Sequence, residues 1–161
     1  MVSSVVVTIE GVNLSEGYIV RELSIYYVGT KSTRHHHFNP PTNFHLNEDN
    51  RKTDAYTRKK LGGLGVFTVI PGGKPYEESA AIVTELGAYK IICAGEITRK
   101  WLRTILPHGN IVDIQETTKF VYPKELVSTW CGYFHANFRY CSYGKLLTLV
   151  YFLKFSGEIV Y

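Results

Sequence analysis

The sequence predicts an α/β fold, in which a mixed sheet of three antiparallel strands followed by short parallel strands carries helices on both faces. The first forty residues contain three β-rich runs joined by short turns, which is typical of an antiparallel meander. Beyond them, helical patterns alternate with short apolar runs, as expected of parallel strands covered by helices. The chain of 161 residues is 45% hydrophobic and 20% charged, so we treat residues 1–161 as a single domain with one ordinary core.

The three strands of the meander are predicted over residues 5–9, 18–28 and 34–38. Glu10 and Gly11 are expected to end the first strand, and residues 13–17 have the composition of a turn. Residues 39–41 read Asn-Pro-Pro and close the third strand, because proline has no N–H group for the ladder.

Helices are predicted over residues 47–61, 75–86, 96–106 and 141–155, with a shorter helical stretch at 123–130. Pro75 suits the first position of a helix, and Pro107 stops the following one. The last helix is apolar on most faces and is expected to be buried. Short strands are predicted between the helices, at residues 66–70, 90–93 and 111–114.

This order of elements is similar to that of the ribonuclease H-like fold in its three-to-five exonuclease version. Such exonucleases use several carboxylates to hold two metal ions, which clamp the scissile phosphate and activate water. Here the first strand carries Thr8 and Glu10 where an acidic pair would stand, and Asp113 is the other candidate acid. Glu10 and Asp113 supply too little charge for two Mg²⁺ ions. We therefore expect them to be remnants, and we assign no catalytic residue.

A different set of metal ligands precedes the last predicted helix. Cys131, His135 and Cys141 form a Cys-x3-His-x5-Cys pattern. Thiolates and an imidazole suit a tetrahedral Zn²⁺ ion. Two small buried cysteines beside an unrelated surface histidine would give the same pattern, and the residues alone do not separate these readings. A fourth ligand would have to come from Glu22 or from the histidines at 35–37.

Glu22 is the only acid inside an otherwise apolar strand. If its side chain points inward, the buried carboxylate needs a partner or a metal ion. The alternative is an outward carboxylate paired with Arg21 or Arg34.

Three adjacent histidines follow in the third predicted strand. Side chains alternate across a strand, so only His35 and His37 can converge on one face. His36 is expected to be an exposed imidazole.

The segments RELSI at 21–25 and HHHFNP at 35–40, together with Cys131, His135 and Cys141, resemble the Maelstrom domain. The resemblance implies a catalytically degenerate relative of the exonucleases, with a ribonuclease H-like fold and one structural zinc ion per chain. It implies that Glu22, Cys131, His135 and Cys141 are the zinc ligands, with His35 as an alternative. We expect a stand-alone relative, because no high-mobility-group box accompanies the domain.

The resemblance also implies a role in RNA silencing of transposons through the piRNA pathway, with single-stranded RNA as the partner. Some relatives are described as cutting such RNA without the exonuclease acids. The net charge of +4 permits RNA binding without requiring it. The candidate RNA-binding residues are basic, and most lie in predicted helices: Arg58, Lys59, Lys60, Arg99, Lys100, Arg103 and Arg139. Charges on helices are also common on plain solvated surfaces.

Two other functions fit the sequence. The chain would be an active metal-dependent nuclease if its carboxylates were relocated to Glu10, Glu22, Asp113 and Glu116. A protein-interaction scaffold would suit its twelve tyrosines, which are common at interfaces. No nucleotide cofactor is indicated.

The compartment is predicted from three absences. No window reaches the roughly 18 apolar residues of a membrane-spanning helix. The first residues lack the basic and apolar regions of a signal peptide. The odd count of three cysteines does not suit a disulfide framework. We therefore expect an intracellular protein, cytoplasmic or nuclear, without a membrane partner.

Overall fold

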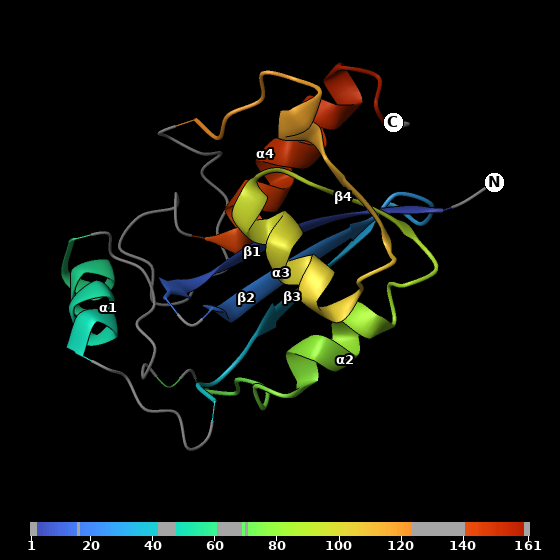
Figure 1. The fold of residues 1–161 in the computed structure, drawn as a ribbon. Helices are drawn as coiled ribbons and strands as arrows, with labels where there is room; N and C mark the ends of the chain where they lie inside the picture. Colours follow the sequence, from blue (N-terminus) through green and yellow to red (C-terminus); the bar gives the residue numbers. More distant parts are fainter. Residues whose placement is uncertain are drawn as a thin grey trace.

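A computed structural model describes residues 3–15, 17–41, 48–60, 69, 71–123 and 141–159, with the backbone alone over 57–60. Five strands form one sheet in the order β3-β2-β1-β4-β5 (Figure 1). They are β1 Ser4–Leu14, β2 Gly17–Tyr27, β3 Ser32–His37, β4 Lys90–Cys93 and β5 Asn110–Asp113. The first three strands pair antiparallel, whereas β4 pairs parallel to β1 and β5 parallel to β4. The predicted mixed sheet is confirmed.

The described helices are α1 Glu48–Lys60, α2 Glu78–Thr84, α3 Glu96–Ile105 and α4 Ser142–Phe155, and the 3-10 helix η1 covers Ile114–Glu116. Helix α2 begins three residues after the predicted Pro75, because Tyr76 and Glu77 form a turn. The predicted helical stretch at 123–130 and the predicted strand at 66–70 lie almost wholly outside the described residues. Within the described residues, no helix has the length and apolar character needed to cross a membrane.

The first strand does not end at Gly11, as the sequence suggested, but continues to Leu14. The register with β2 shifts between Glu10 and Gly11, which pair with Glu22 and Val20, so Arg21 is the extra residue. Gly11 therefore lies opposite a β-bulge of β2 and not in a turn. A Cβ atom at Gly11 would overlap the carbonyl oxygen of Ile19 on the paired strand. Close approach of the two backbones therefore requires glycine here.

The sheet is covered on both faces, as predicted. On one face, Val5 and Val7 of β1 share a core with Trp101 and Leu102 of α3. On the other face, Val6 shares a second core with α4. Figure 1 shows α2 and α3 next to each other, whereas α4, coloured red, lies apart from α2. Because side chains alternate along a strand, Thr8 and Glu10 lie on the α4 face with Val6.

The start of α4 is held against the centre of the sheet. The hydroxyl group of Thr8 donates a hydrogen bond of 2.6 Å to the carbonyl oxygen of Ser142, which is the first residue of α4. Both residues are buried. This contact brings the first turn of α4 beside the middle of β1 and β2.

A candidate metal centre between two strands and the last helix

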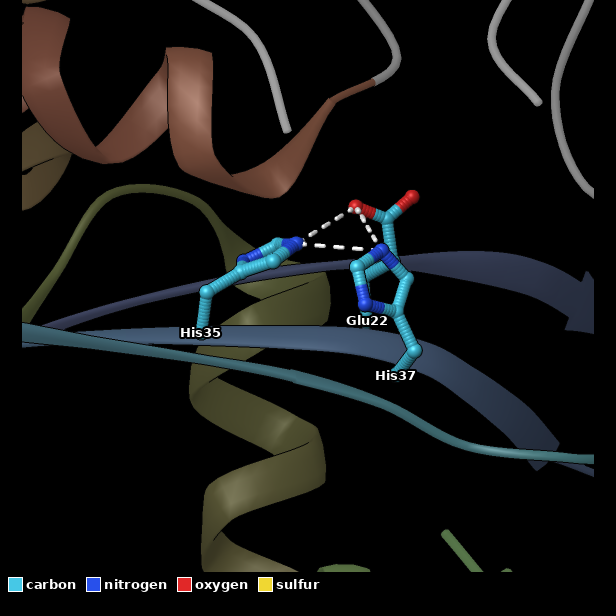
Figure 2. Close-up of side chains that lie close together, drawn as sticks. All are labelled: Glu22, His35 and His37. Carbon is cyan, nitrogen blue, oxygen red and sulfur yellow. Dashed lines mark hydrogen bonds and ion pairs between the residues drawn. The ribbon is translucent and has the colours of Figure 1, made fainter. Parts of the chain in front are cut away.

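Three metal-binding side chains meet on the α4 face of the sheet. Glu22 of β2 is paired with His37 of β3 in the ladder, and His35 lies two residues before His37. The period of two puts both imidazoles on the face that carries Glu22. Figure 2 shows the two rings and the carboxylate converging on a common point. This Glu22–His35–His37 cluster could hold a metal ion.

The distances within the cluster suit a small metal ion. His35 Nε2 lies 3.5 Å from Glu22 Oε1, and His37 Nε2 lies 3.8 Å from the same oxygen. The two Nε2 atoms are 3.1 Å apart. Ligand atoms around a tetrahedral zinc ion are separated by about 3.4 Å when the bonds are about 2.1 Å long. The three donor atoms therefore have the spacing of one face of such a tetrahedron.

Glu22 is buried, so the negative charge of its carboxylate must be offset. The side chain of Glu22 is fully buried, and those of His37 and His35 are only 9% and 15% exposed. An ionised carboxylate in such a place is costly unless a cation or several hydrogen bonds offset its charge. The outward-facing carboxylate considered above, paired with Arg21 or Arg34, is therefore wrong: Glu22 points inward, toward the two histidines.

Two serine hydroxyl groups hold the cluster in position. Ser24 Oγ forms a short hydrogen bond with His35 Nδ1, and it lies 2.8 Å from Ser142 Oγ. Ser142 Oγ in turn donates to Glu22 Oε1 at 3.4 Å. A histidine that binds metal through Nε2 usually has its Nδ1 group hydrogen-bonded to an oxygen. The contact with Ser24 thus leaves His35 Nε2 directed at Glu22 and His37.

The sequence reasoning missed both serines. Ser24 had a local signal, because it stands two residues after Glu22 and so shares its face of β2. Ser142 had none, since it lies 118 residues further along the chain and reaches the cluster only through the packing of α4.

Of the four ligands implied by the resemblance, the structure describes Glu22 and Cys141. Cys141 is buried at the N-cap of α4, immediately before the serine that contacts Glu22 and His35. It is not one of the three residues whose donor atoms converge. Cys131 and His135 lie outside the described residues. The structure thus brings Glu22 together with His35, the alternative ligand, and with His37.

His36 lies on the opposite face of β3. Its ring stacks on Phe38, with ring centroids 6.3 Å apart. The side chain is half-buried, so the expectation of an exposed imidazole is wrong. Burial, followed by the nearby charges of Lys74 and Arg34, lowers the pKa of His36 to about 4. At the end of β3, Phe38 forms a parallel bridge with Lys74.

The two remnant acids are engaged elsewhere. Glu10 Oε2 accepts a hydrogen bond of 2.8 Å from the ammonium group of Lys145. Asp113 accepts hydrogen bonds from the backbone N–H groups of Gly95 and Gln115, at 2.9 and 3.0 Å, and so caps η1. Neither acid belongs to the group of converging donors found among the described residues.

The three basic candidates on α3 also have intramolecular partners. Arg99 forms an ion pair with Glu116, and Lys100 with Glu96 at 2.7 Å. Arg103 donates to the carbonyl oxygens of the loop that follows the helix. Surface ion pairs of this kind are weak, so they do not prevent contact with a phosphate. The side chains of Arg58, Lys59 and Lys60, and all of Arg139, lie outside the described residues.

Comparisons with known proteins add no relative. No family model, no curated protein and no solved structure matches this chain.

Proposed function

We propose that this chain is a ribonuclease H-like domain without two-metal catalysis, in which one structural zinc ion joins the start of α4 to β2 and β3. The observation that carries the proposal is the convergence of Glu22, His35 and His37. Three donor atoms lie within 4.8 Å of one another in a buried place where three elements meet.

The types of donor atom favour zinc over magnesium. Two imidazole nitrogens and one carboxylate oxygen suit Zn²⁺, whereas Mg²⁺ prefers oxygen ligands and retains several waters. Cys141 directly precedes Ser142 at the start of α4, so it is our candidate for a thiolate ligand. The Maelstrom resemblance implies a different set of four, in which Cys131 and His135 join Glu22 and Cys141. His35 is then an alternative ligand, and His37 stands beside the ion.

A zinc ion with four protein ligands has no open position for water. Such a site stabilises the fold and does not activate a nucleophile. Here it would connect β2 and β3 to the end of the chain, more than a hundred residues away. The pairing of Glu10 with Lys145 and the capping role of Asp113 also favour a non-catalytic domain over a nuclease with relocated carboxylates.

We propose single-stranded RNA as the partner of this domain, in a small-RNA pathway that silences transposons. Support comes from the resemblance, from the net charge of +4 and from the basic residues on α3. These residues lie on the face of the sheet opposite the metal cluster. Zinc would therefore stabilise the domain without touching the RNA.

Metal content tests the zinc site. Protein purified without a histidine tag should contain one zinc per chain. Glu22→Gln should lower that content, because Glu22 belongs to both ligand sets. Loss of zinc in His37→Ala would favour the set seen in the cluster, and loss in Cys131→Ser would favour the set that the resemblance implies. The matched control is His36→Ala, which removes a histidine from the same strand but from its other face. Zinc-free wild-type protein that is fully folded would refute the site.

RNA binding is tested separately, by fluorescence anisotropy with a short single-stranded RNA. Replacing both Arg99 and Lys100 by Gln should weaken binding. The slope of log K against log salt concentration should become shallower, by the equivalent of up to about two phosphate contacts. Lys154→Gln on α4 is the control. Equal affinities of the two variants would count against RNA recognition by α3.

A further inference from the structure

A cavity of about 570 Å³ opens on the α3 face of the sheet, at the end of the β1–β2 hairpin. This volume lies within the range of about 300–1,000 Å³ that is usual for small-molecule sites. The cavity lies on the opposite face from the Glu22–His35–His37 cluster, because its wall belongs to the core that packs on α3. It is therefore a separate site.

Aromatic side chains form its walls. Tyr18 from the start of β2, Tyr76 from the turn before α2 and Trp101 from α3 all line it. Trp101 is 8% exposed and belongs to the core, against which Tyr18 and Tyr76 pack while partly buried. A backbone hydrogen bond with Val20 further fixes Tyr76. The walls are thus held in place by the fold before any ligand arrives.

The rim of the cavity carries balanced charge. Glu96 and Lys100 both line it, and they pair with each other at 2.7 Å while remaining 63% and 70% exposed. The amide of Asn13 adds a donor and an acceptor. The hydroxyl oxygen of Thr104, which donates its proton to the carbonyl oxygen of Trp101, adds an acceptor. Among the described residues, the rim thus carries one cation and one anion, which offer hydrogen bonds of both kinds.

The tyrosine hydroxyl groups remain neutral donors at physiological pH. Burial, followed by the charges of Glu10 and Glu22, holds the pKa of Tyr18 well above its usual range. Burial likewise raises the pKa of Tyr76. Aromatic walls with neutral polar groups suit a flat ring that has its own donors and acceptors.

We infer that this cavity binds one neutral heteroaromatic base of the kind that nucleosides carry, stacked on the aromatic side chains with its polar edge at the rim. Aliphatic ligands would not use the ring faces, and a phosphate-rich ligand would meet Glu96. The base could come from a free nucleoside or from an unpaired nucleotide of a nucleic-acid strand. The titration below separates these two sources.

Tryptophan fluorescence provides the readout. The chain has two tryptophans, so Trp130→Phe leaves Trp101 as the reporter. This protein is titrated with adenosine, guanosine, cytidine and uridine, with their monophosphates, and with a short single-stranded oligonucleotide. We expect saturable quenching by at least one nucleoside, and no tighter binding of its monophosphate. If only the oligonucleotide quenches the fluorescence, the bound base comes from a nucleic-acid strand and not from a free nucleoside.

Two variants test the walls and the rim. Tyr76→Ala should weaken binding by about tenfold or more, as expected when a stacking partner is lost. Asn13→Ala, at an exposed position that does not threaten folding, should weaken it by a smaller factor. Tyr151→Ala on the exposed face of α4 is the control and should have no effect. Absence of saturable quenching with every probe, or quenching unchanged in both cavity variants, would overturn the inference.

Discussion

Lys145 of α4 forms an ion pair with Glu10 of β1, with 2.8 Å between Nζ and Oε2. The same ammonium group donates to the carbonyl oxygen of Ile9 and lies over the ring of Tyr122. Both charged side chains are about one-fifth exposed or less. An internal cation thus stands next to Glu10, one of the two acids that the sequence analysis treated as remnants of a nuclease site.

We predict that Lys145→Met destabilises the protein by about 1–3 kcal/mol, because Glu10 then loses its charged partner in a mostly buried place. Denaturant unfolding of the single variants and of the double variant with Glu10→Gln measures the coupling between them. The control is Lys100→Met, which removes the exposed pair with Glu96 and should cost less than about 0.5 kcal/mol. Equal losses in the two lysine variants would contradict the prediction.

We predict that Ser24→Ala weakens zinc binding by about 10–100-fold, as is usual when the group that orients a metal-binding histidine is removed. Competition with a chromogenic chelator measures the affinity. Ser32→Ala is a matched control, since this serine lies on the neighbouring strand and is exposed. If both variants retain zinc equally, the Ser24–His35 contact does not orient a ligand.

The sheet and the two histidines of the cluster could be predicted from local patterns. Alternation along the third strand was enough to place His35 and His37 on one face, and the structure confirms that they converge. Alternation does not give register, however. That Glu22 pairs with His37 is decided by the hairpin between β2 and β3, so the meeting of carboxylate and imidazoles needed the structure.

Long-range contacts explain the remaining differences. Ser142 and Lys145 reach the sheet from more than a hundred residues away, and no local pattern encodes such packing. Gly11 was misread because glycine ends strands as readily as it marks a bulge. Only the approach of the Ile19 carbonyl group distinguishes the two cases.

We predict that Gly11→Ala destabilises the protein by about 2–4 kcal/mol, because the added Cβ atom would force the paired backbones apart at the bulge. Thermal and denaturant unfolding measure this change. Gly29→Ala is the control: this turn glycine has open space around its Cβ position, and the variant should change stability by less than about 0.5 kcal/mol. Similar stabilities of the two variants would mean that the bulge can relax.

We predict that part of the loss of stability in alkaline solution comes from Cys93. Burial raises the pKa of its thiol from 9.0 to about 12, and Asp113 adds to the effect. Below pH 9 the thiol is protonated in both the folded and the unfolded protein, so it adds no pH dependence. Between pH 9 and 12 the unfolded chain releases this proton while the folded protein retains it, so the free energy of unfolding falls as the pH rises.

The measurement is the free energy of unfolding at several pH values from 8 to about 11, for the wild type and for Cys93→Ala. The smaller side chain of the variant lowers its free energy of unfolding by an amount that does not depend on pH. The comparison therefore uses only the slopes of the free energy of unfolding against pH. Near pH 10.5 the wild type should have lost about 2 kcal/mol more than the variant, relative to each protein at pH 8. Parallel slopes would show that Cys93 ionises equally in both states and that the core around β4 admits water.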